Sequence, residues 1–171
     1  MSAALALKAA RLAGVEVQLS GNNLSLRAPS KPPPAVLDAL RRQKAEVVVL
    51  LRPGRDGWSA EDWQLYFEER AAVAEFDGGL SRIQAEAQAF ECCVVKWLDR
   101  NPAPSTPGTC AWCGRADAAV VPFGTEPGTH AWLHAECWRM WHAKRRTEAA
   151  ASLKSMGITG SIDAHESSTR E

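Results

Sequence analysis

The hydrophobic positions of the first fifty residues change period twice. Apolar residues recur at helical spacing as far as Gly14. Strict alternation of apolar and polar residues then covers 15–19 and returns over 24–28, which predicts a hairpin with one buried face. The prolines at 32–34 favour a helix start, and apolar residues at intervals of three and four continue to Leu51. The pattern predicts the order helix, hairpin, helix.

Two longer helical periods occupy residues 53–101. The first starts at Ser59, in a segment that resembles a capping box, and stops at 76–79, while the second stops at Asn101. Two amphipathic helices joined by a short turn predict a helical hairpin. An aromatic stripe follows these helices, and its spacing favours core packing over a cofactor-binding or base-stacking box: Trp63, Tyr66, Phe67, Phe90 and Trp97.

Composition limits the class of protein. The chain has 171 residues, 46% hydrophobic and 23% charged, and no apolar stretch approaches the roughly 18 residues of a membrane span. These values exclude a chain that is disordered throughout and a large enzyme domain, and we expect a cytoplasmic protein. Pro and Gly mark residues 102–109 as a linker, and the small and polar residues of 148–171 predict a frayed or disordered tail.

The zero net charge hides an asymmetry between segments. Residues 1–52 hold eight Lys and Arg against three Asp and Glu, residues 53–101 hold five against ten, and residues 102–171 hold seven of each. One interpretation is that the basic and acidic segments are ordinary solvated surfaces that partly face each other. The other is that the basic first module binds an acidic partner.

The first 52 residues resemble a known family of docking domains. A Gly14-Val15 pair leads into the alternating apolar residues, and Leu24 and Leu26 follow on the second strand of the predicted hairpin. This pattern resembles the TubC-type N-terminal docking domains of nonribosomal peptide and polyketide synthetases. The resemblance implies an α-β-β-α-α fold whose exposed edge strand accepts a short C-terminal peptide of an upstream subunit, aided by basic side chains. The proline run replaces the family's usual turn.

Carried over to this chain, the resemblance places the docking edge at residues 24–28, with Arg27 as a basic contact. We expect an extended acidic and apolar peptide as the partner, because main-chain pairing supplies affinity while basic side chains select acidic residues. Arg27 is otherwise an ordinary solvated charge, and the acidic residues 53–101 are an alternative cover for the edge. The residues expected to contact the partner are Leu24, Leu26, Arg27, Arg41 and Arg42.

The last third of the chain carries a metal-binding pattern. Cys110 and Cys113 form a Cys-x-x-Cys pair, and after 20 intervening residues His134 and Cys137 form a His-x-x-Cys pair. Two residues between ligands let both side chains of a pair reach one ion, so the two pairs complete a tetrahedral Cys₃His shell. Three thiolates and an imidazole suit a borderline-soft ion, which predicts one structural Zn²⁺ per chain.

The segment around these ligands resembles a treble-clef zinc finger over residues 110–147. We expect a knuckle, a strand over 118–123, a turn over 124–128, and a helix from Cys137 onward. His130 competes with His134 as the fourth ligand, but only His134 stands two residues from Cys137. The order of motifs differs from that of zinc deaminases, in which the His-x-Glu motif comes first.

Two other groups of residues have alternative interpretations. Cys92 and Cys93 have no ligand partner close in sequence, so we expect buried thiols. The helix after Cys137 combines basic residues with tryptophans, which is typical of a nucleic-acid contact, although basic residues also complement the negative end of any helix. The candidates for such a contact are Arg139, Lys144, Arg145 and Arg146.

The sequence therefore predicts an α+β, mostly helical protein made of an αββα docking-like module, a helical hairpin and a treble-clef-like zinc finger. The expected function is that of a non-catalytic, bacterial-type adaptor that recognises a protein or an acidic peptide by strand addition. A nucleic-acid-binding accessory factor is the alternative. Neither membrane contact nor a small-molecule substrate is expected.

Overall fold

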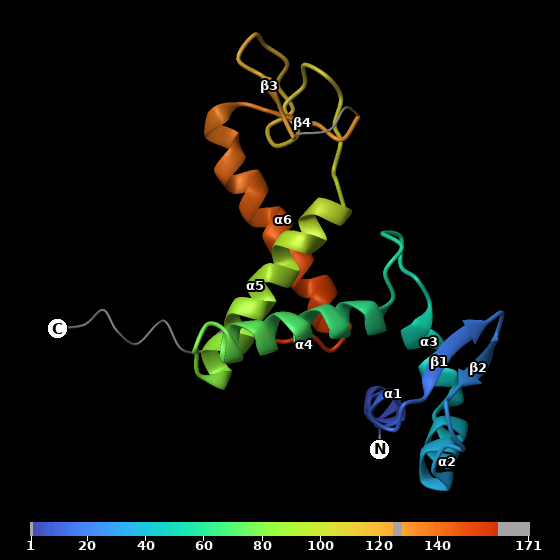
Figure 1. Cartoon of the computed structure of the whole chain (residues 1–171). Helices are drawn as coiled ribbons and strands as arrows, with labels where there is room; N and C mark the ends of the chain where they lie inside the picture. Colours follow the sequence, from blue (N-terminus) through green and yellow to red (C-terminus); the bar gives the residue numbers. More distant parts are fainter. Residues whose placement is uncertain (1, 125–127, 161–171) are drawn as a thin grey trace. The chain divides into compact units, whose positions relative to one another are not determined.

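The computed structural model describes residues 2–124 and 128–160. Within them the chain is α+β and mostly helical, with two separate two-stranded antiparallel sheets, so the predicted fold class is confirmed (Figure 1). The chain divides into two compact units, residues 1–66 and 67–171. No helix in the described part of the chain combines the length and the apolar character needed to cross a membrane.

The first unit begins with a helix, a hairpin and two further helices: α1 (Ala3–Leu12), β1 (Glu16–Ser20), β2 (Asn23–Arg27), α2 (Pro34–Arg42) and α3 (Lys44–Leu51). The expectation of a single helix after the prolines is wrong. The backbone leaves α-helical geometry at Gln43, whose φ is −104° and ψ is 17°. This break produces the α-β-β-α-α order that the docking-domain resemblance implies.

The hairpin of the first unit is closed by a two-residue loop. Ser20 pairs with Asn23, and the register continues to Glu16 opposite Arg27. Gly21 takes the first loop position with a φ of +60°, in the region that favours glycine. Asn22 and Asn23 then accept hydrogen bonds from the side chains of Arg52 and Lys44, at 2.9 Å and 2.8 Å. These bonds tie the loop to α3 and to the residue that follows it.

Small residues dominate the core of the first unit. Alanines on one face of α1 let α2 and α3 approach closely, and the buried set is Ala3, Ala6, Leu7, Ala10, Val15, Ala39, Leu40 and Val47. The second strand is less buried than its alternation predicts. Leu24 is partly buried, but Leu26 is 40% exposed. The core of the first unit therefore covers Leu24 of β2 but leaves Leu26 accessible to solvent.

Helix α4 (Ala60–Phe76) begins at a reciprocal cap and contains the boundary between the two units. The hydroxyl of Ser59 accepts from the N–H of Asp62 at 3.1 Å, and the Asp62 carboxylate accepts from the N–H of Ser59 at 2.7 Å. The predicted helix start is confirmed. Trp63 is 1% exposed and packs edge-to-face against Trp58, with ring centroids 4.7 Å apart, which supports core packing for this part of the aromatic stripe.

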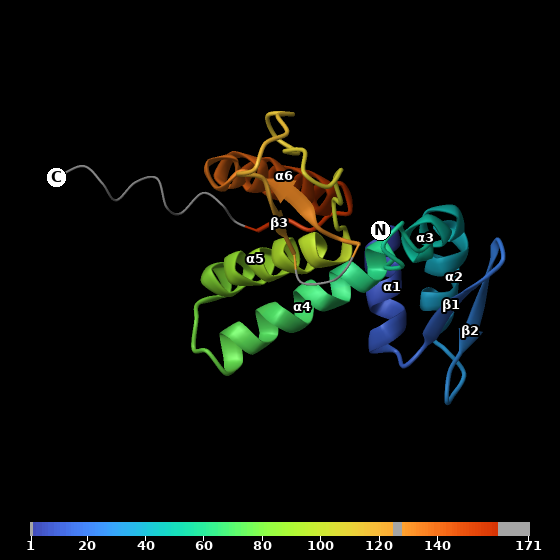
Figure 2. The same ribbon diagram turned by 90° about the horizontal axis from the view of Figure 1, so that it is seen from above.

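The second unit combines long helices with a short hairpin: α5 (Arg82–Arg100), β3 (Val121–Phe123), β4 (Ala131–Leu133) and α6 (Ala135–Ser155). α5 packs chiefly against α6; the two helices cross in the view of Figure 1 and lie next to each other in Figure 2. The predicted hairpin over residues 53–101 is therefore not a separate unit. α4 and α5 follow each other through a short turn, but the main packing partner of α5 comes from the end of the chain.

Two predicted segment boundaries need correction. The strand expected over 118–123 begins only at Val121. The tail predicted over 148–171 is wrong for its first part, because α6 continues to Ser155 and both Leu153 and Ile158 are buried. Residues 161–171 lie outside the described residues, as do 125–127 within the predicted turn. The segment 102–109 has no helix or strand, as expected of a linker, but Ser105 hydrogen-bonds the residues around β4 through its N–H and its hydroxyl.

The correction at the end of α6 leads to a stability prediction. Leu153 is fully buried, so Leu153→Ala should lower the free energy of unfolding by about 2–5 kcal/mol through lost burial and a residual cavity. Met140→Ala is the matched control, because Met140 lies on the same helix and is 54% exposed. Chemical denaturation of the purified chain measures both variants. Equal, small effects would contradict the burial of this segment.

Candidate metal centre

Cys110 and Cys113 lie in a tight knuckle before β3. The N–H of Gly114 donates to the carbonyl of Cys110 at 2.9 Å, and the N–H of Cys110 donates to the carbonyl of Arg115 at 2.9 Å. Gly114 has a φ of +75°, which favours glycine at this position. The N–H of Cys113 also donates to the Cys110 thiol. The reversal of the chain brings both sulfur atoms to the same side of the loop.

The second pair of ligands is placed by β4 and the start of α6. His134 is the residue before the first turn of α6, and Cys137 lies within that turn, its N–H donating to the carbonyl of His134 at 3.0 Å. The N–H of Ala111 donates to the carbonyl of Trp132 at 2.8 Å, which fastens the knuckle to β4. A small core surrounds the site: Cys110, Val120, Ala131, Leu133 and Cys137, with Phe123, Trp132 and Trp141 packed against it.

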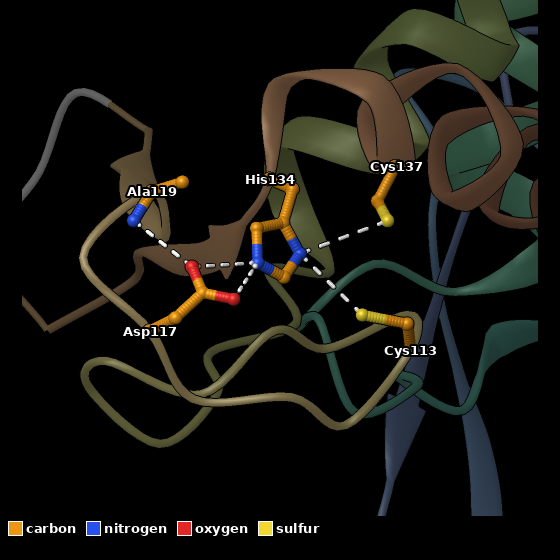
Figure 3. Close-up of polar contacts among 5 residues, drawn as sticks. All are labelled: Cys113, Asp117, Ala119, His134 and Cys137. Carbon is orange, nitrogen blue, oxygen red and sulfur yellow. Dashed lines mark hydrogen bonds and ion pairs between the residues drawn. The ribbon is translucent and has the colours of Figure 1, made fainter.

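The four predicted ligands meet at one point. Their ligand atoms all lie within 4.8 Å of one another, and only Cys113 is exposed. The Nδ1 atom of His134 lies 3.4 Å from the Sγ of Cys113 and 3.9 Å from the Sγ of Cys137 (Figure 3). Ordinary Zn–S and Zn–N bond lengths place neighbouring tetrahedral ligands about 3.6 Å apart. The cluster could therefore hold a metal ion.

The choice between the two candidate histidines follows from their positions. His134 is 1% exposed and belongs to the cluster. His130 lies beside Gly124, where its ring carbon Cδ2 comes within 3.2 Å of the position that a Cβ would take. Its carbonyl accepts from the N–H of Ser105 at 3.1 Å. Among the described residues, His134 is the histidine that the fold brings to the thiols.

The three thiols of the cluster have unequal affinities for protons. Burial opposes ionisation of Cys110, but backbone N–H groups of Cys113, His134 and Trp112 outweigh it and lower the pKa of its thiol to about 6. Burial, together with the neighbouring Cys110 and Cys113, raises the pKa of Cys137 to about 12. A thiolate at Cys137 would be buried beside a second negative charge. A bound cation removes this conflict, because it stabilises all three thiolates together.

The exposed thiol of the cluster has a basic neighbour. The backbone N–H of Arg115 and, after it, the Arg115 guanidinium hydrogen-bond Cys113 and lower the pKa of its thiol. Both groups favour the thiolate, which is the form that binds metal. Ligand spacing alone does not identify Arg115 as part of the site.

A carboxylate contacts the opposite edge of the imidazole ring. The Nε2 atom of His134 lies 3.1 Å from both oxygens of Asp117, and Oδ1 of Asp117 accepts from the N–H of Ala119 at 3.0 Å (Figure 3). The hydrogen bond from the ring to Asp117 is the main reason that the pKa of His134 rises to about 9. Ligand spacing did not identify Asp117. Its only signal in the sequence is a carboxylate in the loop after a Cys-x-x-Cys pair.

The other cysteines lie outside this cluster. Cys92 and Cys93 are on α5, where Cys93 is fully buried and Cys92 partly buried. Burial raises the pKa of the Cys93 thiol to about 12. Neither cysteine belongs to the group of ligand atoms that come together at the candidate site. The expectation of buried thiols is confirmed for Cys93 but not for Cys92.

Half of the predicted nucleic-acid contacts are engaged within the fold. Arg145 donates to Glu148 at 2.5 Å and to the carbonyl of Asn101, and its guanidinium lies 5.1 Å from the ring centroid of Trp97. Arg146 is paired with Glu91 of α5 at 2.5 Å. Arg139 and Lys144 are exposed. The basic end of the predicted patch therefore helps to hold α6 against α5.

The predicted partner-binding residues are divided between a groove and open surface. Three of them, Leu24, Leu26 and Arg41, line a groove of about 310 Å³ together with Asn23, Leu37, Leu40 and Lys44. Arg27 and Arg42 are exposed and lie outside this lining.

Comparison of the chain with family models, curated proteins and solved structures found no match. The docking-domain resemblance stays a prediction.

The cluster makes a direct prediction about metal content. Cys113→Ser and Cys137→Ser should each lose stoichiometric metal, because each removes one of four donors at the same point. The double variant Cys92→Ala/Cys93→Ala should keep it. Elemental analysis of the purified variants measures the metal content. Full retention of metal in both serine variants would contradict the site.

Proposed function

We propose that the chain is a non-catalytic adaptor, in which one Zn²⁺ stabilises the C-terminal finger and the N-terminal hairpin binds an extended acidic and apolar peptide. The convergence of Cys110, Cys113, His134 and Cys137 carries the first half of the proposal. The open edge of β2 and the groove beside it support the second half.

The donor set favours zinc in a structural role. Three thiolates and one imidazole in a compact cluster suit Zn²⁺, whereas Mg²⁺ and Ca²⁺ prefer oxygen ligands. A catalytic zinc keeps one coordination position open to water, and four protein donors leave none. Three of the four donors are also buried, which limits access of a substrate to the ion.

The core of the finger is too small to account for its stability without a metal. It consists of five buried residues, two of which are themselves ligands, and its sheet has three residues in each strand. Domains of this size usually need a metal, a disulfide or a partner, because they bury too little apolar surface. A structural Zn²⁺ contributes on the order of 10 kcal/mol to the folding of such a domain.

The edge of β2 has main-chain groups that a peptide can pair with. In an antiparallel hairpin closed by a two-residue loop, alternate residues direct their N–H and C=O groups away from the partner strand. From the register of this hairpin, those residues are Leu24 and Leu26. Within residues 2–124 and 128–160, no backbone hydrogen bond from outside the hairpin reaches them. An added strand would satisfy these groups.

The groove beside β2 matches an acidic and apolar ligand. Leu24, Leu26, Leu37 and Leu40 form its apolar part, and Arg41 and Lys44 lie in the same lining. Arg41 is highly exposed, and Asp38, its partner at 3.1 Å, is also exposed, so the pair is weak and easily replaced. Residues 1–52 carry eight basic against three acidic residues, and this excess favours an acidic partner.

Removal of zinc should unfold the finger and leave the first unit folded. After treatment with a strong zinc chelator, backbone amides of the knuckle, β3, β4 and the first turns of α6 should lose protection in hydrogen-exchange mass spectrometry. Those of α1 and α3 should keep it, because their core contains no ligand. Zinc added back in slight excess is the control. Unchanged protection in the finger would contradict a structural role for the metal.

Peptide binding should depend on main-chain pairing and on Arg41. The probe is a labelled decapeptide of alternating leucine and glutamate, compared with one in which lysine replaces glutamate, and binding is measured by fluorescence anisotropy. Leu26→Pro should bind the acidic peptide more weakly than Leu26→Ala, because both lose the side chain but only proline lacks the N–H. Arg41→Glu should weaken binding more than Arg42→Glu, since only Arg41 lines the groove.

Hydrogen exchange of the free full-length chain distinguishes an open edge from a covered one. The amides of Leu24 and Leu26 should exchange faster than that of Ser25, which faces β1. Slow exchange at Leu24 and Leu26 would mean that the acidic segment 53–101 already covers the strand. Equal binding of the acidic and basic peptides would also exclude the proposed partner.

A further inference from the structure

We propose that Asp117 is a positioning residue of the metal centre, which fixes His134 so that Nδ1 is the ligand atom and Nε2 keeps its proton. The inference rests on the proposed binding of Zn²⁺ and adds which histidine nitrogen is the ligand and what determines it. Figure 3 shows the arrangement, with the imidazole ring between the two thiols and the carboxylate.

The two nitrogens of His134 face different chemical groups. Nδ1 lies 3.4 Å from the Sγ of Cys113 and 3.9 Å from the Sγ of Cys137. Nε2 lies 3.1 Å from each oxygen of Asp117. An ionised carboxylate only accepts hydrogen bonds, so the atom that faces it must carry a proton. In the neutral imidazole the lone pair is then on Nδ1, which faces the sulfur atoms.

The carboxylate is itself held in place. The N–H of Ala119 donates to its Oδ1 at 3.0 Å, and Asp117 lies in the same short loop as the knuckle. The His134 side chain is 2% exposed, whereas the Asp117 side chain is 48% exposed. The carboxylate thus stays partly solvated while the ring is buried. Asp117 can keep its charge at little cost and direct it at a buried donor.

This arrangement predicts how the imidazole binds the ion. A carboxylate that accepts the Nε2 proton fixes the tautomer and the ring orientation, and it makes Nδ1 more basic as a ligand. The Nε2 proton stays on the ring when the metal binds, while Nδ1 and those thiols that still carry a proton release theirs. Without Asp117 the ring has two tautomers and an unpaired donor in a buried position.

Asp117 also has a purely structural alternative role, since it caps the N–H of Ala119. A measurement on the ring itself separates the two roles. In ¹⁵N-labelled, zinc-loaded protein, long-range ¹H–¹⁵N correlation should show His134 with a protonated Nε2 and a metal-bound Nδ1. A metal-bound Nε2 would overturn the inference, even if the protein holds one zinc per chain.

Three variants measure the contribution of Asp117 to metal affinity. Asp117→Ala removes the acceptor and should weaken zinc binding by roughly 10- to 100-fold in competition with a chromophoric chelator. Asp117→Asn keeps an acceptor for both N–H groups and loses only the charge, so it should lose less affinity and keep the Nε2–H tautomer. Glu136→Gln is the matched control, because it removes an exposed charge two residues from His134, with no contact to the ring expected.

The outcomes distinguish a failure of the proposed role of Asp117 from a failure of the proposed zinc site. Wild-type affinity in Asp117→Ala, with zinc still bound by the wild type, would overturn the role of Asp117 and leave the metal site intact. Equal losses in Asp117→Ala and Glu136→Gln would show a general charge effect and would also overturn it. A wild-type chain that binds no zinc would exclude both the site and the inference.

Discussion

The C-terminal finger depends on the convergence of three thiols and one imidazole in a space of a few ångströms. Sulfur atoms this close cannot all ionise without a cation, since burial and their mutual repulsion raise the pKa of Cys137 to about 12 while backbone N–H groups lower that of Cys110 to about 6. The surrounding apolar core is small. Each backbone feature of the finger, from the reversal at Gly114 to the placement of His134 before α6, serves to bring these donors together.

Different interactions stabilise the two units. In the first, alanines of α1 pack against α2 and α3, and hydrogen bonds from the side chains of Lys44 and Arg52 hold the hairpin loop. No cluster of candidate metal ligands occurs among the described residues of that unit. Its second strand is incompletely covered, because Leu26 is 40% exposed. A two-stranded sheet with an open edge is marginal by itself. Our proposal places a partner strand at this open edge, beside the groove lined by Leu24, Leu26 and Arg41.

The structural features that the sequence predicted correctly are those determined by residues close together along the chain. Turn residues, helix caps and ligand spacing act over a few positions. They predict the β1–β2 hairpin, the start of α4 after Ser59, the end of α5 near Asn101 and the four candidate ligands. The break at Gln43 was missed because α2 and α3 continue one apolar period across it. The packing of α5 against α6, and with it the helical character of residues 148–155, depends on contacts between segments far apart in sequence. Such contacts leave no local pattern.

Asp117 shows that a ligand motif does not identify every residue that shapes a metal site. A Cys-x-x-Cys pair constrains which residues reach the ion, because both ligands share one short turn. The residue that hydrogen-bonds the other ring nitrogen has no fixed spacing from the histidine. It needs only to lie within hydrogen-bond distance of Nε2. Here it is Asp117, 17 residues before His134. Spacing predicts His134 as a ligand, whereas only the folded loop shows that its Nδ1 faces the thiols and its Nε2 faces Asp117. The orientation of the ring, and hence the electronic character of the fourth donor, is a property of the tertiary structure.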